Sequence, residues 1–126
     1  MRKHIVLLAL VLAFLFRTTP GQRIMFAADW WYSSTYENVG GLYSPYLDEY
    51  YCNNPSSCLH EQGHSEDRNL NWYSDSPEFV ADVTNCDDPY VQFAARTEDD
   101  PKELYADIYS LVSPEGTLVE YLEAEC

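Results

Sequence analysis

Basic residues are scarce in this 126-residue chain: seven Lys or Arg accompany 21 Asp or Glu, and the formal net charge is −14. Three of the seven, Arg2, Lys3 and Arg17, lie within the first 21 residues, so residues 22–126 carry only four and have a net charge of −17. A chain this acidic is repelled by phosphate groups, which excludes nucleic acid and anionic membranes as partners. A basic protein partner or a cationic substrate is compatible with the charge.

Long apolar runs and glycine-rich loops are also missing. The apolar run at residues 5–16 is too short for a transmembrane helix, and the five glycines are too scattered for a phosphate-cradling loop. The run follows Arg2 and Lys3 and precedes a Thr-Pro-Gly segment, which is the pattern of a secretory signal peptide. We therefore expect residues 1–21 to be a signal peptide. Residues 22–126 should form one small domain, secreted to the extracellular space as a monomer without a stable membrane anchor.

Cysteine occurs only four times, and no two cysteines form the CxxC pair of a zinc finger. An even number in an exported chain indicates two disulfides and argues against a catalytic thiol. Three pairings are formally possible. We expect Cys52 to pair with Cys58 and Cys86 with Cys126.

Helical patterns dominate the second half of the chain. Ser57 is the expected N-cap of a helix over residues 58–72, and Ser76 followed by Pro77 indicates the start of another. Apolar spacing predicts further helices from about 87–89, from 98–101 to 112, and over 118–122. Residues 27–51 are rich in Trp, Tyr, Ser and Gly, which favours short strands or ordered loops over a long helix. These patterns predict a small, mostly helical, disulfide-stabilised α+β domain.

Only two histidines remain outside the expected signal peptide, and they form the motif His60-Glu61-Gln62-Gly63-His64. On a helix, positions i and i+4 share a face, so the two imidazoles can converge on one Zn²⁺ while Glu61 acts as a general base toward a water molecule. A catalytic zinc site needs a third protein ligand, which here must be a carboxylate. Asp67, at i+7, drifts out of reach on a straight helix, and the sequence leaves open the downstream candidates Asp75, Glu78, Asp87 and Asp88.

Three stretches of the chain resemble the secreted fungal aspzincins, the deuterolysin and lysine-specific metalloendopeptidase group. They are Tyr50-Tyr51-Cys52 with Cys58, the His60–His64 motif, and the segment 85–94, which reads Asn-Cys-Asp-Asp-Pro-Tyr-Val-Gln-Phe-Ala. The resemblance implies a zincin-like fold, a Zn²⁺ cofactor and hydrolysis of peptide bonds in a peptide or protein substrate. The family's transition-state tyrosine has no counterpart, because the corresponding position is Glu78.

Carried over to this chain, the resemblance implies His60 and His64 as zinc ligands and Glu61 as the catalytic base. Asp75, eleven residues after His64, is the expected third ligand, and Asp87 is the alternative. Resemblance and negative charge together predict a preference for lysine near the scissile bond.

A non-enzymatic function is the competing hypothesis. The chain contains 11 tyrosines and three tryptophans, and its N-terminal half could serve a small secreted interaction protein of the effector, toxin or inhibitor type. Cys58-Leu59-His60-Glu61 is also weakly similar to the cysteine and histidine helix of secreted phospholipases A2, but the aspartate after the histidine and the calcium loop of those enzymes are missing.

Overall fold

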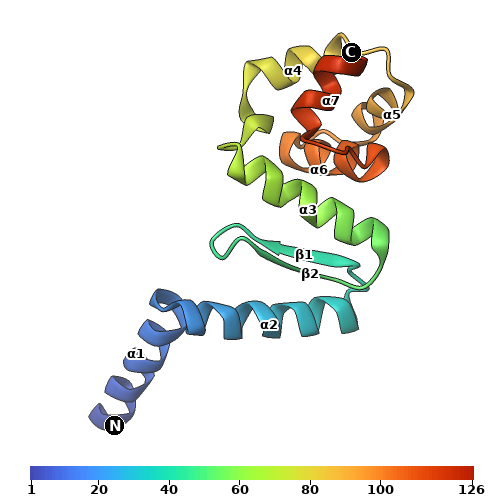
Figure 1. The fold of residues 1–126 in the computed structure, drawn as a ribbon. Helices are drawn as coiled ribbons and strands as arrows, with labels where there is room; N and C mark the ends of the chain where they lie inside the picture. The colour runs from blue at the N-terminus through green and yellow to red at the C-terminus, as the bar shows by residue number, and fades with distance from the viewer. The chain divides into compact units, whose positions relative to one another are not determined.

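The structure, a computed structural model, describes all 126 residues, which form two compact units, Met1–Val39 and Gly40–Cys126. The first unit consists of helices α1 (Arg2–Arg17) and α2 (Thr19–Tyr36), which meet at an angle of 85° (Figure 1). The hydroxyl oxygen of Thr18 accepts a hydrogen bond from the Gly21 backbone at 3.1 Å and thereby caps α2. Only glycine fits at position 21, because a Cβ there would lie 2.1 Å from the Phe14 carbonyl oxygen.

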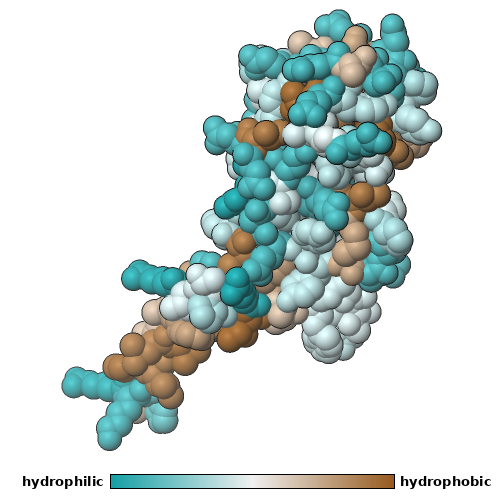
Figure 2. Space-filling model, viewed as in Figure 1, coloured by the Kyte–Doolittle hydropathy of each residue, from teal (hydrophilic) through white to brown (hydrophobic).

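The apolar side chains of α1 are exposed, and α1 buries no residue (Figure 2). Neither helix alone is long and apolar enough to cross a membrane, whereas the bent pair passes that test of length and composition together. The boundary between the two units lies after Val39, not after Gly21. Cleavage after Gly21 stays a prediction.

The prediction of strands or loops is wrong for residues 27–36, which continue α2. The capped helix runs on through this segment because aromatic residues disfavour helix only weakly, and along a helix their side chains can pack on one another. Tyr36 does so with both Trp31 and Tyr32, at ring-centroid distances of 5.7 and 5.3 Å. The Ser34 hydroxyl donates back to the Trp30 carbonyl oxygen at 2.6 Å, a local bond that the helix tolerates.

The second unit begins with a hairpin of β1 (Gly41–Ser44) and β2 (Glu49–Cys52), which confirms the strand prediction for this part. The strands are antiparallel, with Tyr43 opposite Tyr50. Helix α3 (Pro55–Asn69) packs against the hairpin on one side and against α6 (Pro101–Val112) on the other (Figure 1). The remaining elements are η1 (Tyr73–Asp75), α4 (Pro77–Thr84), α5 (Pro89–Thr97) and α7 (Leu118–Glu125).

The ends of α3 differ from the predicted ones. Its N-cap is Asn54 rather than Ser57, because the Asn54 side chain accepts a hydrogen bond from the Ser57 backbone at 2.9 Å and Pro55 fits the first turn. The helix ends at Asn69 rather than Trp72, because Trp72 and the residue before it have left-handed φ angles.

The apolar core of the second unit lies among α4, α5, α6 and α7. Its largest buried side chains belong to Phe79, Tyr105, Ile108, Leu118 and Leu122. The two disulfides, Cys52–Cys58 and Cys86–Cys126, are the predicted ones.

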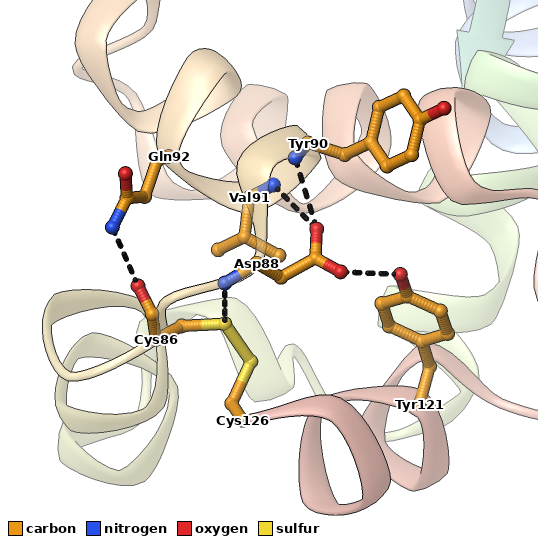
Figure 3. The surroundings of a disulfide bond; sticks show 7 residues. All are labelled: Cys86, Asp88, Tyr90, Val91, Gln92, Tyr121 and Cys126. Atoms are coloured by element: carbon orange, nitrogen blue, oxygen red, sulfur yellow. Dashed lines mark hydrogen bonds between the residues drawn. A yellow bond between two sulfur atoms is a disulfide. The ribbon is translucent and has the colours of Figure 1, made fainter.

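The second disulfide joins the loop between α4 and α5 to the C-terminal residue Cys126 (Figure 3). Next to it, Asp88 accepts hydrogen bonds from the backbone of α5 and from the Tyr121 hydroxyl at 2.8 Å. This part of the chain thus confirms the small, mostly helical, disulfide-stabilised α+β domain.

Helices α3 and α6 approach closely at Gly63. A Cβ at this position would lie 2.9 Å from the Ala106 Cα and 3.0 Å from the Tyr109 Cβ. Glycine weakens a helix by roughly 1 kcal/mol relative to alanine, but here it allows the two backbones to meet. This contact brings the polar face of α6 to the histidines of α3.

Candidate metal centre

The two histidines of the motif share one face of α3, as predicted. Their Nε2 atoms lie 3.1 Å apart, and both rings are largely shielded from solvent. The separation of four residues, slightly more than one helical turn, produces this convergence. The HExxH segment therefore forms the helical half of a candidate metal centre.

Glu103 supplies the third group from the first turn of α6. Asp100 caps this helix by accepting from the Lys102 and Glu103 backbones, which fixes the position of Glu103. Its Oε2 lies 2.9 Å from the His60 Nε2, and its Oε1 lies 3.2 Å from the His64 Nε2. Two imidazoles and one carboxylate thus converge, and their ligand atoms all lie within 4.8 Å of one another.

The spacing of the two histidine nitrogens is close to that in a tetrahedral zinc site. With Zn–N and Zn–O distances of about 2.0–2.1 Å, two ligand atoms of a tetrahedron are ~3.3 Å apart. The 3.1 Å between the two nitrogens lies close to that value, and the carboxylate reaches the two histidines through different oxygens, at 2.9 and 3.2 Å. The group can hold a metal ion, and its donor set of two histidines and one glutamate is one that catalytic zinc sites use.

Asp107 orients the ring of His60 through Nδ1, the ring nitrogen that does not face Glu103. Its Oδ1 lies 2.9 Å from the Nδ1 of His60, so the ring donates its Nδ1 proton to this carboxylate. The His60 Nε2, which faces His64 and Glu103, then carries either a second proton that it donates to Glu103 or a lone pair for a cation. Metal-binding histidines usually have such a partner on the second nitrogen.

The electrostatics of the group favour positive charge at its centre. Burial lowers the pKa of His60, but the hydrogen bond and charge of Glu103 outweigh it and hold this pKa above its usual value. Hydrogen bonds from His60 and His64 hold the pKa of Glu103 far below its usual range. Glu103 is therefore ionised at neutral pH, as a metal ligand must be.

Glu61 lies beside the histidines and is only 6% exposed. Its carboxylate packs against the backbone of β1, where a Cβ on Gly41 would come within 2.7 Å of Oε1. Burial raises the pKa of Glu61, which makes it a stronger base than an exposed carboxylate.

A cleft of about 410 Å³ opens at the candidate metal centre. Glu61, both histidines and Glu103 line it together with β1 and with Trp72 and Lys102. The cleft is large enough for a short segment of a substrate beside the three candidate ligands.

Asp75, the expected third ligand, is not brought to the histidines. It is exposed on η1 and pairs with Lys102 at 2.7 Å. Of the alternatives, Asp88 caps α5, while Glu78 and Asp87 are exposed. Asp67 is fully buried and accepts hydrogen bonds from the Ser74 backbone and hydroxyl at 2.9 and 2.6 Å. None of these carboxylates belongs to the convergent group.

Sequence reasoning missed Glu103 and Asp107. The available signal was their i, i+4 spacing on the face of α6 opposite its apolar stripe. That signal places two acids on one helical face, but it does not reveal that this face meets α3.

Comparisons with known proteins add no relative: no family model, curated protein or solved structure matches the chain. The functional argument therefore depends on the geometry of the site.

Proposed function

We propose that this protein is a secreted zinc-dependent peptidase whose metal ligands are His60, His64 and Glu103. The observation that carries the proposal is the convergence of their ligand atoms within 4.8 Å of one another, with a buried glutamate in the same cleft. A zincin-like arrangement, in which the HExxH helix lies between a strand pair and a second ligand-bearing helix, is part of this proposal. The aspzincin relationship is part of the proposal, with two departures: a glutamate stands in place of the family's aspartate ligand, and the family's transition-state tyrosine has no counterpart.

The chemistry divides between the metal and the protein. His60, His64 and Glu103 would hold the zinc ion, which would supply a Lewis acid for activating water and polarising a carbonyl group. Glu61 accepts a proton from water in the cleft and returns it to the departing amine of the substrate. Gly41 keeps the carboxylate of Glu61 in place, and Asp107 holds the ring of His60. A substrate segment lies along the cleft between β1 and the start of α6.

Two measurements on the purified protein test the proposal. Zinc titration should give one ion per chain, and an unfolded protein substrate should be cleaved by the zinc-loaded form but not after chelation. Glu61→Gln should keep the zinc and lower the rate of cleavage by about 10²–10⁴-fold, the usual contribution of a general base. Absence of zinc binding, or cleavage that survives Glu61→Gln, would contradict the proposed function.

A second candidate is favoured by the exposed aromatic cluster on α2. Trp31, Tyr32 and Tyr36 are 52–66% exposed and contact one another. Such residues are enriched in protein interfaces, and the acidity of the chain favours a basic protein partner. If this is the function, the parent protein would cleave no substrate, with or without zinc.

A further inference from the structure

The two histidines of the centre are held in different ways. His60 has a carboxylate partner on its second nitrogen, Asp107, whereas both polar contacts of the His64 ring involve Nε2, the nitrogen that faces the other ligands. A ligand ring without a partner on its second nitrogen needs another restraint to fix its orientation. The surroundings of His64 contain one such restraint.

Tyr43 stacks on the ring of His64. The two ring centroids are 5.7 Å apart and the ring planes differ by only 18°, which is a parallel, offset stack. Tyr43 belongs to β1, the strand that packs against α3. The stack therefore restrains rotation of the His64 ring from the hairpin side.

A hydrogen-bonded clamp holds Tyr43 itself. Its hydroxyl donates to Oδ1 of Asp48 at 2.7 Å, and the same oxygen accepts from the hydroxyl of Ser65, the neighbour of His64 on α3, also at 2.7 Å. Asp48 has a φ of 50° in the hairpin turn and also receives the Asn69 side chain. The turn of the hairpin is thus hydrogen-bonded to α3 at the residue next to His64.

We propose that Tyr43 is a positioning residue that holds the metal ligand His64 in its binding orientation and is itself fixed by the Asp48–Ser65 clamp. The inference rests on the proposed metal centre and deepens it: zinc affinity depends on the β1–β2 hairpin as well as on the ligand helices. Tyr43 does not contact the metal, because its ring face meets the imidazole and its hydroxyl is engaged by Asp48.

The hairpin offers a matched control. Tyr46 lies three residues after Tyr43 and is 87% exposed. Tyr46→Leu removes the same side chain from the same hairpin without touching the metal centre. A difference in zinc affinity between Tyr43→Leu and Tyr46→Leu therefore reflects the contact of the Tyr43 ring with His64 and not merely the loss of a tyrosine.

The test is a zinc titration of the parent protein and its variants against a chromophoric chelator, with circular dichroism to verify folding. Tyr43→Leu should raise the Kd for zinc about tenfold, the lower end of the usual effect of losing a residue that orients a metal ligand. Tyr43→Phe keeps the ring but loses the hydrogen bond to Asp48, so its Kd should rise less than that of Tyr43→Leu. Tyr46→Leu should leave the Kd unchanged. If Tyr43→Leu does not fold, Tyr43→Met replaces it, because methionine fills the space with a flexible side chain that has no ring face.

A second readout separates orientation from general stability. In the metal-free protein, the NMR signals of the His64 ring protons should carry a ring-current shift that Tyr43→Phe retains and the folded Leu or Met variant loses. Equal zinc affinity and equal His64 shifts in the parent and in that variant would overturn the role of Tyr43. If the parent binds no zinc but the His64 shift behaves as described, the stack is real and the proposed metal centre has failed.

Discussion

The two faces of α6 contrast in how the fold uses them. One face places Tyr105 and Ile108, both fully buried, in the apolar core with α4, α5 and α7. The other presents Glu103 and Asp107 to the histidines of α3. Apolar burial contributes about 25 cal/mol per Å² and is non-directional, so it fixes where the helix lies. The polar contacts of Glu103 and Asp107 depend on orientation, and they form because the helix is already held in that position.

This contrast predicts that the core and the site respond separately to substitution. Changes in the core should alter the free energy of unfolding and leave the zinc affinity of the folded protein intact. Changes in the site should lower the zinc affinity and leave the free energy of unfolding intact. Only residues at the contact between α3 and α6 should alter both.

The largest effect on stability is expected for Phe79→Ala. Phe79 is 1% exposed and contacts the ring of Tyr105 at a centroid distance of 5.6 Å. Its truncation should lower the free energy of unfolding by about 3–5 kcal/mol. Phe93→Ala is the control, since Phe93 is 59% exposed and should contribute less than about 0.5 kcal/mol. Denaturant unfolding of the metal-free proteins measures both values, and equal losses would contradict the position of the core.

Gly63→Ala should affect the core and the site together. The added Cβ meets the Ala106 backbone at 2.9 Å and forces α3 and α6 apart. We expect a loss of about 1–3 kcal/mol in stability, the usual cost of overpacking, together with weaker zinc binding. At Gly116 the added Cβ meets the end of the flexible Glu120 side chain, so Gly116→Ala should change neither quantity. A Gly63→Ala protein that keeps full zinc affinity would contradict the claim that the contact between α3 and α6 sets the geometry of the site.

Asp107→Ala should weaken zinc binding without a comparable loss of stability. Removing the partner of a ligand histidine typically costs 10–100-fold in metal affinity. Asp107→Asn keeps an acceptor for the His60 ring and should lose less. Zinc titration of the two variants tests whether Asp107→Ala loses more affinity than Asp107→Asn. An unchanged zinc affinity in Asp107→Ala would contradict the role of Asp107.

The smallest effect concerns substrate charge. Glu61, Glu103 and Asp100 line the cleft, and the charge of Lys102 is offset by Asp75 at 2.7 Å. Peptides with lysine near the scissile bond should therefore be cleaved faster than the matching glutamate peptides, by about fivefold, as for a weakly screened surface charge pair. Equal kcat/KM values for the two peptides would remove the predicted lysine preference.

The sequence predicted the parts of this fold that depend on neighbouring residues. The helical spacing of His60 and His64, the Pro77 helix start and the local disulfide Cys52–Cys58 all follow from short segments of chain. The third member of the candidate metal centre did not, because Glu103 lies 43 residues after His60 in a chain with 21 acidic residues. Only the approach of two helices at Gly63 selects it.

Local composition also misled in one place. The aromatic residues after Ala27 favour strands on propensity, but the cap at Thr18 starts a helix that continues through them. Tertiary contacts and caps outweigh such weak preferences.

The most direct test of the account compares Glu103→Gln with Asp75→Asn. Both variants remove one negative charge near the cleft, but only Glu103 joins the histidines, while Asp75 pairs with Lys102. Zinc titration should show a loss of more than about 100-fold in affinity for Glu103→Gln, beyond the usual effect of an outer partner, and almost none for Asp75→Asn. Full affinity in Glu103→Gln, or loss of zinc in Asp75→Asn alone, would contradict the metal centre described here.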